Sequence, residues 1–165
     1  METIAMYWES KVRTYGFQLV QGLHLCRAGF PMDGISALGA FLQRMAGNDL
    51  AFRAVWAQAD GKGQIRIYLL CDSSQLSKLR VFGSDEPLLA SDRWAASQLV
   101  DMICFQGPHF GDRYGIVDYS LKALASAKMP VWGAVCSTAT IHLVVPAGRG
   151  DQAKQLLTDA FEIPK

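Results

Sequence analysis

Residues 107–116, GPHFGDRYGI, gather residue types that can bind a charged small molecule. Glycines, a histidine, a tyrosine and both signs of charge lie between an apolar run at 98–106 and a helix-like run at 114–128. The first turn of a helix has backbone N–H groups without intrahelical partners, and it carries the positive end of the helix dipole. A loop of this kind can bind an anion such as a carboxylate. Residues 107–116 are therefore the first candidate for a ligand site.

The same loop carries His109 and Asp112, two groups that could take part in acid–base chemistry. The sequence places no nucleophile or third group beside them, so we expect no enzyme. The nucleotide-binding patterns G-x-G-x-x-G and G-K-[ST] are absent from the chain. No two cysteines stand at C-x-x-C spacing, so we expect neither a metal site nor a cofactor. The cysteines, expected to be free thiols, are Cys26, Cys71, Cys104 and Cys136.

The chain has 165 residues, a formal net charge of +1, and half of its residues are hydrophobic. This composition suits a folded protein of one ordinary domain or two small ones. Lys and Arg are scattered without a basic run, so we expect no nucleic-acid partner. No window approaches the roughly 20 apolar residues that cross a bilayer, and the first residues do not resemble a signal peptide. We expect a cytoplasmic protein that does not bind membranes.

Apolar periodicity and turn residues divide the chain into strands and helices. Strands are expected at 12–29 and 98–106, and strand pairs at 50–71, with a break at Asp60-Gly61, and at 131–146. Helices are expected at 33–46, 73–83, 114–128 and 149–163. We expect Asp33 to cap its helix, Gly16 and Gly22 to break or bulge the first strand, and residues 84–97 to join two halves.

The order strand, helix, hairpin, helix occurs twice, as an internal repeat of roughly 75 residues. Each copy predicts a ferredoxin-like βαββαβ unit with its helices on one face of an antiparallel sheet, so the fold class is α+β. The second copy ends without its fourth strand, whereas the first strand-like run is long enough for two. We expect residues 12–19 to complete the second unit, and residues 86–92, EPLLASD, to complete the first. The predicted domains are residues 20–90, and residues 12–19 plus 98–163.

Residues 107–161 resemble the last ACT domain of aspartokinases. The matching features are a glycine eight positions before the helix-opening glycine, an A-L-A helix core, a serine near the hairpin bend and a closing A-x-x-x-L-x-x-x-F helix. They fall on Gly107, Gly115, Ala123, Leu124, Ala125, Ser137, Val144, Val145, Ala153, Leu157 and Phe161. Residues 12–83 are similar to the preceding ACT domain through Gly34, Ile35 and the hairpin entered at AVWAQ. The resemblance covers essentially the whole chain and includes no kinase domain.

The resemblance implies a binding site for a small effector, usually an amino acid such as lysine or threonine. In this family the ligand lies where the strand-to-helix loop of one unit faces a neighbouring unit. Helix N–H groups bind the α-carboxylate, and side chains and strand carbonyls bind the ammonium group. The ligand-binding residues implied here are Met32, Asp33, Gly34, Ile35, Gly111, Asp112, Arg113, Tyr114, Gly115, Ile116 and Trp132.

The chain departs from the family pattern inside this implied pocket. In the family a proline precedes the helix-opening glycine, an asparagine follows the helix, and an acidic residue stands two positions later. The residues at these positions are Asp33, Ala51 and Arg53 in the first unit, and Tyr114, Pro130 and Trp132 in the second. Bulk and opposite charge thus replace the polar contacts, which predicts a pocket that is either reshaped for another ligand or closed.

We therefore expect a non-catalytic regulatory protein of two ACT domains that binds a small effector, docks onto a metabolic enzyme, or both. Two alternatives stay open: a trans-acting regulatory subunit of an aspartokinase, and a structural dimerisation module without a ligand. ACT units expose sheet edges and helix faces, so we expect a homodimer.

Overall fold

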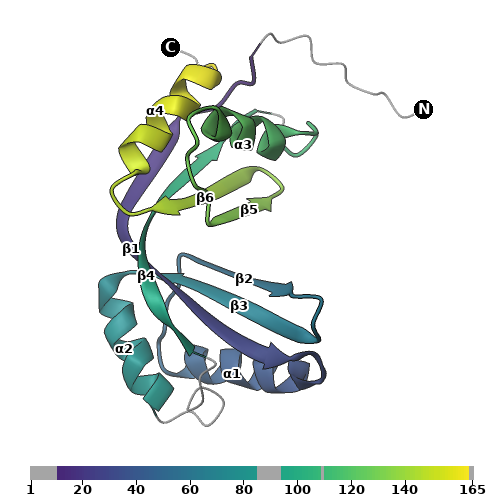
Figure 1. Cartoon of the computed structure of the whole chain (residues 1–165), viewed down its shortest axis with the longest axis vertical. Helices are drawn as coiled ribbons and strands as arrows, with labels where there is room; N and C mark the ends of the chain where they lie inside the picture. Colours follow the sequence, from purple (N-terminus) through teal and green to yellow (C-terminus); the bar gives the residue numbers. More distant parts are fainter. Residues whose placement is uncertain (1–10, 85–93, 109, 164–165) are drawn as a thin grey trace, which may run out of the picture. The chain divides into compact units, whose positions relative to one another are not determined.

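The computed structural model describes residues 11–84, 94–108 and 110–163. These residues form an α+β fold with four α-helices and one six-stranded antiparallel sheet. The strand order in the sheet is β2-β3-β1-β4-β6-β5 (Figure 1). The chain divides into two compact units, and each is described by itself below.

The N-terminal unit comprises residues 21–100. Its elements are β1 (Phe17–Pro31, from residue 21 on), a short 3-10 helix (Met32–Gly34), α1 (Ile35–Gly47), β2 (Ala54–Ala59), β3 (Gln64–Cys71), α2 (Ser73–Ser84) and the first part of β4 (Trp94–Gln106). β1 and β2 both pair antiparallel with β3, so that Phe30 lies opposite Ile65 and Ala54 lies opposite Leu70.

The hairpin between β2 and β3 turns where the sequence predicts it. The Asp60 carboxylate accepts hydrogen bonds from the backbone N–H groups of Lys62 (2.8 Å) and Gln64 (3.2 Å). These hydrogen bonds, together with the nearby Arg66 guanidinium, hold the pKa of Asp60 below its usual value. Gly61 follows with a φ of +70°, a backbone conformation that favours glycine. The Asp-Gly pair therefore closes this turn for local reasons.

The core of the N-terminal unit lies between its strands and the two helices. α1 buries Leu38, Phe41 and Met45 on one face. The Phe41 ring centroid lies 5.5 Å from that of Phe30 on β1 and 5.9 Å from that of Phe82 on α2. The helical spacing of the apolar residues in the sequence thus corresponds to the face that packs on the sheet.

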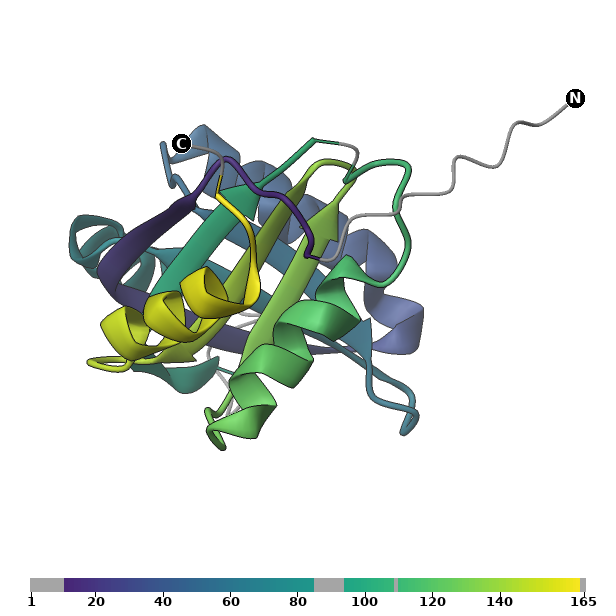
Figure 2. The same ribbon diagram turned by 90° about the horizontal axis from the view of Figure 1, so that it is seen from above.

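The C-terminal unit comprises residues 1–20 and 101–165. Its elements are the start of β1, the rest of β4, α3 (Ile116–Ser126), β5 (Gly133–Ser137), β6 (Thr140–Pro146) and α4 (Gly150–Ala160). β5 pairs antiparallel with β6. The helices α3 and α4 lie side by side on one face of these strands (Figures 1 and 2).

Residues that precede β1 and the first residues of β1 are built into the C-terminal unit. The Thr14 N–H donates to the carbonyl oxygen of Glu162 at 2.9 Å. The Phe17 ring centroid lies 4.9 Å from that of Phe105 on β4 and 5.6 Å from that of Phe161 after α4. A sheet pairing and an aromatic cluster therefore hold this segment in the core of the C-terminal unit.

Two expected boundaries are corrected by the structure. The first strand-like run forms one long strand rather than two, because Gly22 takes a φ of +71° inside β1 and lets the strand bend without ending. The passage 84–97 is not a junction throughout, since β4 already begins at Trp94. The expected fourth strand at 86–92 lies outside the described residues.

Candidate functional site

The loop between β4 and α3, residues 107–115, is anchored at its first glycine. A β-carbon on Gly107 would overlap the carbonyl oxygen of Arg13 and the ring of Phe110. Phe110 is itself buried in the core of the C-terminal unit. Close packing of backbone and ring therefore requires glycine where the loop leaves the strand. His109, predicted to lie in this loop, is outside the described residues.

The start of α3 has no side-chain cap. Gly115 is the N-cap residue, and its φ of +81° lies in the left-handed region that favours glycine. A glycine has no side chain that can accept a hydrogen bond, and the cap shows none. The first-turn N–H groups and the positive end of the helix dipole are therefore donors for an external acceptor. This geometry suits a carboxylate.

Two exposed aromatic side chains belong to the predicted ligand residues of the C-terminal unit. Tyr114, directly before the cap, is 98% exposed, and Trp132, directly before β5, is 41% exposed. The Trp132 N–H donates to the carbonyl oxygen of Val144 at 2.8 Å, so its backbone is held at the edge hairpin. Both rings offer apolar surface with a polar edge to a ligand or a protein partner.

The other predicted residues of this loop lie in different environments. Gly111 and Asp112 are exposed and Arg113 is half-buried. A β-carbon on Gly111 would lie 3.4 Å from Cγ2 of Thr138, which places this part of the loop beside the turn between β5 and β6. Ile116 is buried in the core, so it supports the helix start instead of lining a surface pocket.

The N-terminal unit reaches its helix by a shorter path. Met32–Gly34 form a 3-10 helix of three residues, and the Met32 N–H donates to the carbonyl oxygen of Gly63 at 2.8 Å. Gly34, with a φ of −87°, is the N-cap residue of α1 and has no side-chain hydrogen bond. The expectation that Asp33 caps this helix is wrong, because Asp33 lies one residue too early, inside the 3-10 helix.

The surroundings of this helix start are less suited to a carboxylate. Asp33 is exposed there and brings a negative charge of its own. The neighbouring Met32 and Ile35 side chains are 46% and 66% exposed, so apolar surface adjoins the charge. A ligand carboxylate would meet the like charge of Asp33 here, whereas the carboxylate of Asp118, in the first turn of α3, is paired with the Lys122 ammonium group at 2.6 Å.

The far ends of α1 and α3 correspond closely. Asp49 and Lys128 follow these helices with left-handed φ values of 52° and 51°. Arg53 and Trp132 then each donate their N–H to the second strand of the following hairpin, at 2.7 Å and 2.8 Å. Because α1 has 13 residues and α3 has 11, the additional residues of α1 lie at its start. Residues that are helical at the start of α1 thus correspond to residues that belong to the loop before α3 in the C-terminal unit.

The positions that depart from the family pattern are occupied differently in the two units. The Arg53 guanidinium pairs with the Asp72 carboxylate, with Nε 3.2 Å from Oδ2 and Nη2 3.4 Å from Oδ1. The Ala51 N–H donates to Oε1 of Gln75 at 3.2 Å. In the N-terminal unit these positions are thus satisfied by the unit itself, whereas Trp132 is half-exposed.

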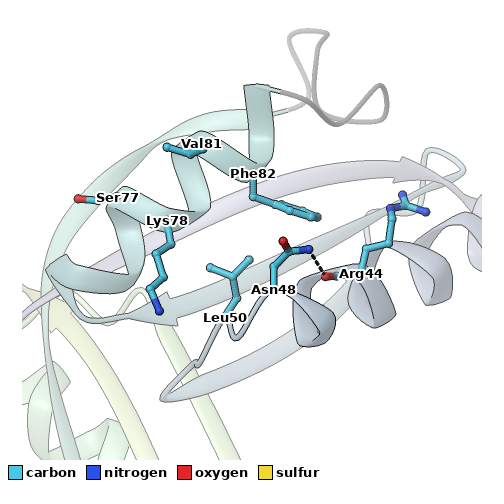
Figure 3. Close-up of a pocket in the computed structure, with 7 residues that line it drawn as sticks. All are labelled: Arg44, Asn48, Leu50, Ser77, Lys78, Val81 and Phe82. Atoms are coloured by element: carbon cyan, nitrogen blue, oxygen red, sulfur yellow. Dashed lines mark hydrogen bonds between the residues drawn. The ribbon is translucent and has the colours of Figure 1, made fainter.

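A cavity of about 670 Å³ lies between the C-terminal end of α1 and one face of α2 (Figure 3). Its lining residues are Arg44, Asn48, Leu50, Ser77, Lys78, Val81 and Phe82. This cavity could not be predicted from the sequence, because its residues come from separate stretches without a recognisable spacing. One feature of the sequence could have indicated it. Lys78 and Phe82 are four residues apart, so a cationic and an aromatic side chain lie on the same face of the expected helix.

Two cysteines lie together in the N-terminal core. Cys26 and Cys71 are fully buried. A hydrogen bond with Cys71, together with burial, raises the pKa of the Cys26 thiol, and the same hydrogen bond lowers the pKa of Cys71. Within the described part of the chain, no group of three His, Cys, Asp or Glu residues is placed to hold a metal ion. No described helix is long and apolar enough to span a bilayer.

Comparison with known proteins gives a match at the level of the fold. No protein-family model matches the chain, and no curated protein matches its sequence. The structure is similar to the regulatory subunit of aspartate kinase from Thermus flavus, with a TM-score of 0.75 and 17% identity over 90% of this chain and 99% of that one. The fold is that of an aspartokinase regulatory region.

Two further solved structures share this aspartokinase regulatory fold. The regulatory subunit of aspartate kinase from Thermus thermophilus, in its ligand-free form, matches with a TM-score of 0.73 and 18% identity over 90% of this chain and 99% of that one. A putative C-terminal regulatory domain of aspartate kinase from Porphyromonas gingivalis W83 matches with a TM-score of 0.64 and 12% identity over 88% and 96%. The resemblance read from the sequence is thus confirmed across about 90% of the chain.

Proposed function

We propose that this chain is a non-catalytic regulatory protein of two ACT domains that binds a small carboxylated effector at the loop 107–115. Each unit is a ferredoxin-like ACT domain, and residues 12–19 complete the C-terminal one. The observation that carries the proposal is the start of α3, where Gly115 leaves the helix amides without a side-chain cap in a fold shared with aspartokinase regulatory subunits.

The two exposed rings beside this helix start set the expected ligand class. Tyr114 and Trp132 replace the proline and the acidic residue of the family pattern, and both offer apolar surface. Neither ring supplies the carboxylate that would pair with a cationic side chain, and the asparagine of the family pattern is Pro130 here. We therefore expect an amino acid or related metabolite with an apolar or aromatic part, and little response to lysine or threonine.

Thermal unfolding with the twenty amino acids and common carboxylate metabolites at millimolar concentration tests this proposal. A ligand at one hundred times its dissociation constant stabilises the fold by about 2.7 kcal/mol, which raises the melting temperature by roughly 5–10 °C. Tyr114→Ser should reduce the shift, because Tyr114 is almost fully exposed beside the cap. Tyr15→Ser, at another exposed tyrosine, is the matched control and should leave the shift unchanged.

A trans-acting regulatory subunit of an aspartokinase is the second candidate. It is favoured by the similar regulatory subunits from two Thermus species, of which this chain covers 99%. Mixing the chain with the aspartokinase of the same organism should give a complex in size-exclusion chromatography and change the sensitivity of the kinase to its effector. Two proteins that elute separately would contradict this candidate.

We propose that the protein is a homodimer in the cytoplasm. β2 and β5 stand at the two ends of the strand order, and among the described residues each has an unpaired side that a second copy can cover. Light scattering at high protein concentration should give twice the mass of the 18.1 kDa chain. A monomer would contradict the dimer, and a dimer that no metabolite stabilises would favour a structural module without a ligand.

A further inference from the structure

The cavity between α1 and α2 belongs to the N-terminal unit alone and differs from the loop 107–115 in position and in chemistry. We propose that it is a separate binding site for small amphipathic anions, in which a carboxylate group is attached to an apolar chain or ring. Its residues lie at the end of α1, about 20 Å along the helix from Gly34. The inference therefore stands independently of an effector at either helix start.

The size of the cavity fits a small molecule. Its volume of about 670 Å³ lies within the roughly 300–1,000 Å³ typical of small-molecule sites. The side chains of Lys78 and Phe82 extend from α2 toward Leu50 and Asn48 at the end of α1 (Figure 3). Two helices thus contribute opposite walls, and Leu50, three residues after the end of α1, supplies the floor.

The charge of the lining favours an anion. Arg44 and Lys78 are both cationic, and no Asp or Glu is among the seven lining residues. Among the described residues the Lys78 ammonium group makes no hydrogen bond or ion pair, so it can donate to a ligand without breaking a contact. The Asn48 side chain donates to the Arg44 carbonyl oxygen at 2.8 Å, which holds its amide in place at the rim.

The apolar part of the lining favours a ligand that also has an apolar body. Leu50 is buried at the floor, Phe82 is half-buried, and Val81 is 68% exposed. Covering this surface removes apolar area from water, which stabilises a bound chain or ring. An inorganic anion would use the charge alone and leave these side chains in water. The combination therefore selects an amphipathic anion.

Octanoate is a suitable probe because it joins one carboxylate to an apolar chain. Titration of the full chain, followed by calorimetry and by backbone amide shifts, should show saturable binding with shifts concentrated at Asn48, Leu50, Lys78 and Phe82. Octylamine has a chain of equal length with the opposite charge, and acetate has the head group without the chain. Both should bind at least about tenfold more weakly than octanoate.

Two substitutions at Lys78 separate the charge from the fold. Lys78→Met keeps an unbranched side chain and removes the charge, so it should weaken octanoate binding by about tenfold. Lys78→Glu should remove octanoate binding and strengthen octylamine binding. The matched control is Lys154→Met on α4 of the C-terminal unit, which should leave octanoate binding unchanged.

The inference is overturned if octanoate shows no saturable binding, if octylamine binds equally well, or if Lys154→Met weakens binding as much as Lys78→Met. Shifts confined to the start of α3 would assign the octanoate to the effector loop and would also overturn a site at α1 and α2. If the loop 107–115 binds no effector, no amino acid will raise the melting temperature, and the octanoate titration will be unaffected. The failure of one proposal can therefore be distinguished from the failure of the other.

Discussion

The two strand-to-helix junctions of this chain come from equivalent parts of the repeat and yet have different structures. In the N-terminal unit three residues in a 3-10 helix lead to Gly34, which has an ordinary negative φ. In the C-terminal unit the longer stretch 107–115 leads to Gly115, which has a positive φ. The first junction is short and adjoins Asp33, and the second is a longer loop beside the exposed Tyr114, while neither helix start has a side-chain cap.

This difference supports the proposal that the C-terminal unit binds an effector that the N-terminal unit does not. The far ends of α1 and α3 match, so the divergence lies at the helix starts alone. Additional helical residues in α1 shorten the loop, and the Arg53–Asp72 ion pair satisfies the charge inside the unit. The N-terminal unit has instead a cavity at the opposite end of the same helix.

The largest expected effect is a difference in stability between alanine substitutions at the two junctions, caused by the space around each glycine. Gly107→Ala places a β-carbon against backbone and a buried ring, and we expect a loss of about 3 kcal/mol of unfolding free energy. Gly34→Ala meets only Pro31, at 3.1 Å from Cγ, and should change the free energy by less than about 1 kcal/mol. Urea unfolding of both variants measures the difference. Equal losses would show that the two loops are equally constrained.

The second helices of the two units offer the next comparison. Asp101 is buried, and its Oδ2 accepts the N–H groups of Gly148 (2.8 Å) and Gly150 (3.1 Å) at the start of α4. Asp101→Ala should cost about 2 kcal/mol in a urea titration, because one buried and one partly buried N–H group lose a charged acceptor. Asp72→Ala, before α2, removes only an exposed ion pair and should cost less than about 1 kcal/mol.

Backbone conformation at the two caps predicts a smaller effect. Gly115→Ala must hold alanine at a φ of +81° and should lower the unfolding free energy by about 1 kcal/mol. Alanine is compatible with the negative φ of Gly34, so Gly34→Ala serves again as the matched variant. Both positions leave the helix amides in place, so Gly115→Ala should retain effector binding in the thermal shift assay. A loss of stability at Gly34 equal to that at Gly115 would contradict the assigned backbone geometry.

The smallest effect concerns pH and a histidine of the C-terminal unit. Burial lowers the pKa of His142 on β6, and its Nδ1 is buried without a partner. The unfolded chain therefore binds a proton more readily below pH 6.5, and stability should fall as the pH decreases from that value. His142→Gln should flatten the melting temperature between pH 6.5 and 5.

Much of the fold was predictable because its signals are local. The helical spacing of Leu38, Phe41 and Met45 gave the buried face of α1, and Asp60-Gly61 gave the hairpin turn. The strand boundaries were less predictable: β1 continues past Gly22, and it lies between β3 and β4 in the sheet. Such pairing is a property of the assembled sheet and leaves no local mark in the sequence.

The candidate sites were predictable only in part. The glycines of the 107–115 loop and their helix were correctly located, but Asp33 was wrongly expected to cap α1. Ile116 was predicted to contact a ligand and lies in the core instead. The statistical preference for N-cap residues and the position in the family pattern each predict a residue type at the cap. A shift of the helix start by one residue is enough to place a different residue there.

The sequence by itself determined the repeat, the helix faces, the turns and the glycine at the start of α3, because each depends on residues close together in the chain. The tertiary structure alone decided that the uncapped start of α3 lies beside exposed rings and that Arg53 forms an ion pair with Asp72. It also decided that Arg44, Leu50, Lys78 and Phe82 line one cavity. These arrangements join residues that are distant in sequence, and only the packing of both helices on the sheet brings them within contact distance.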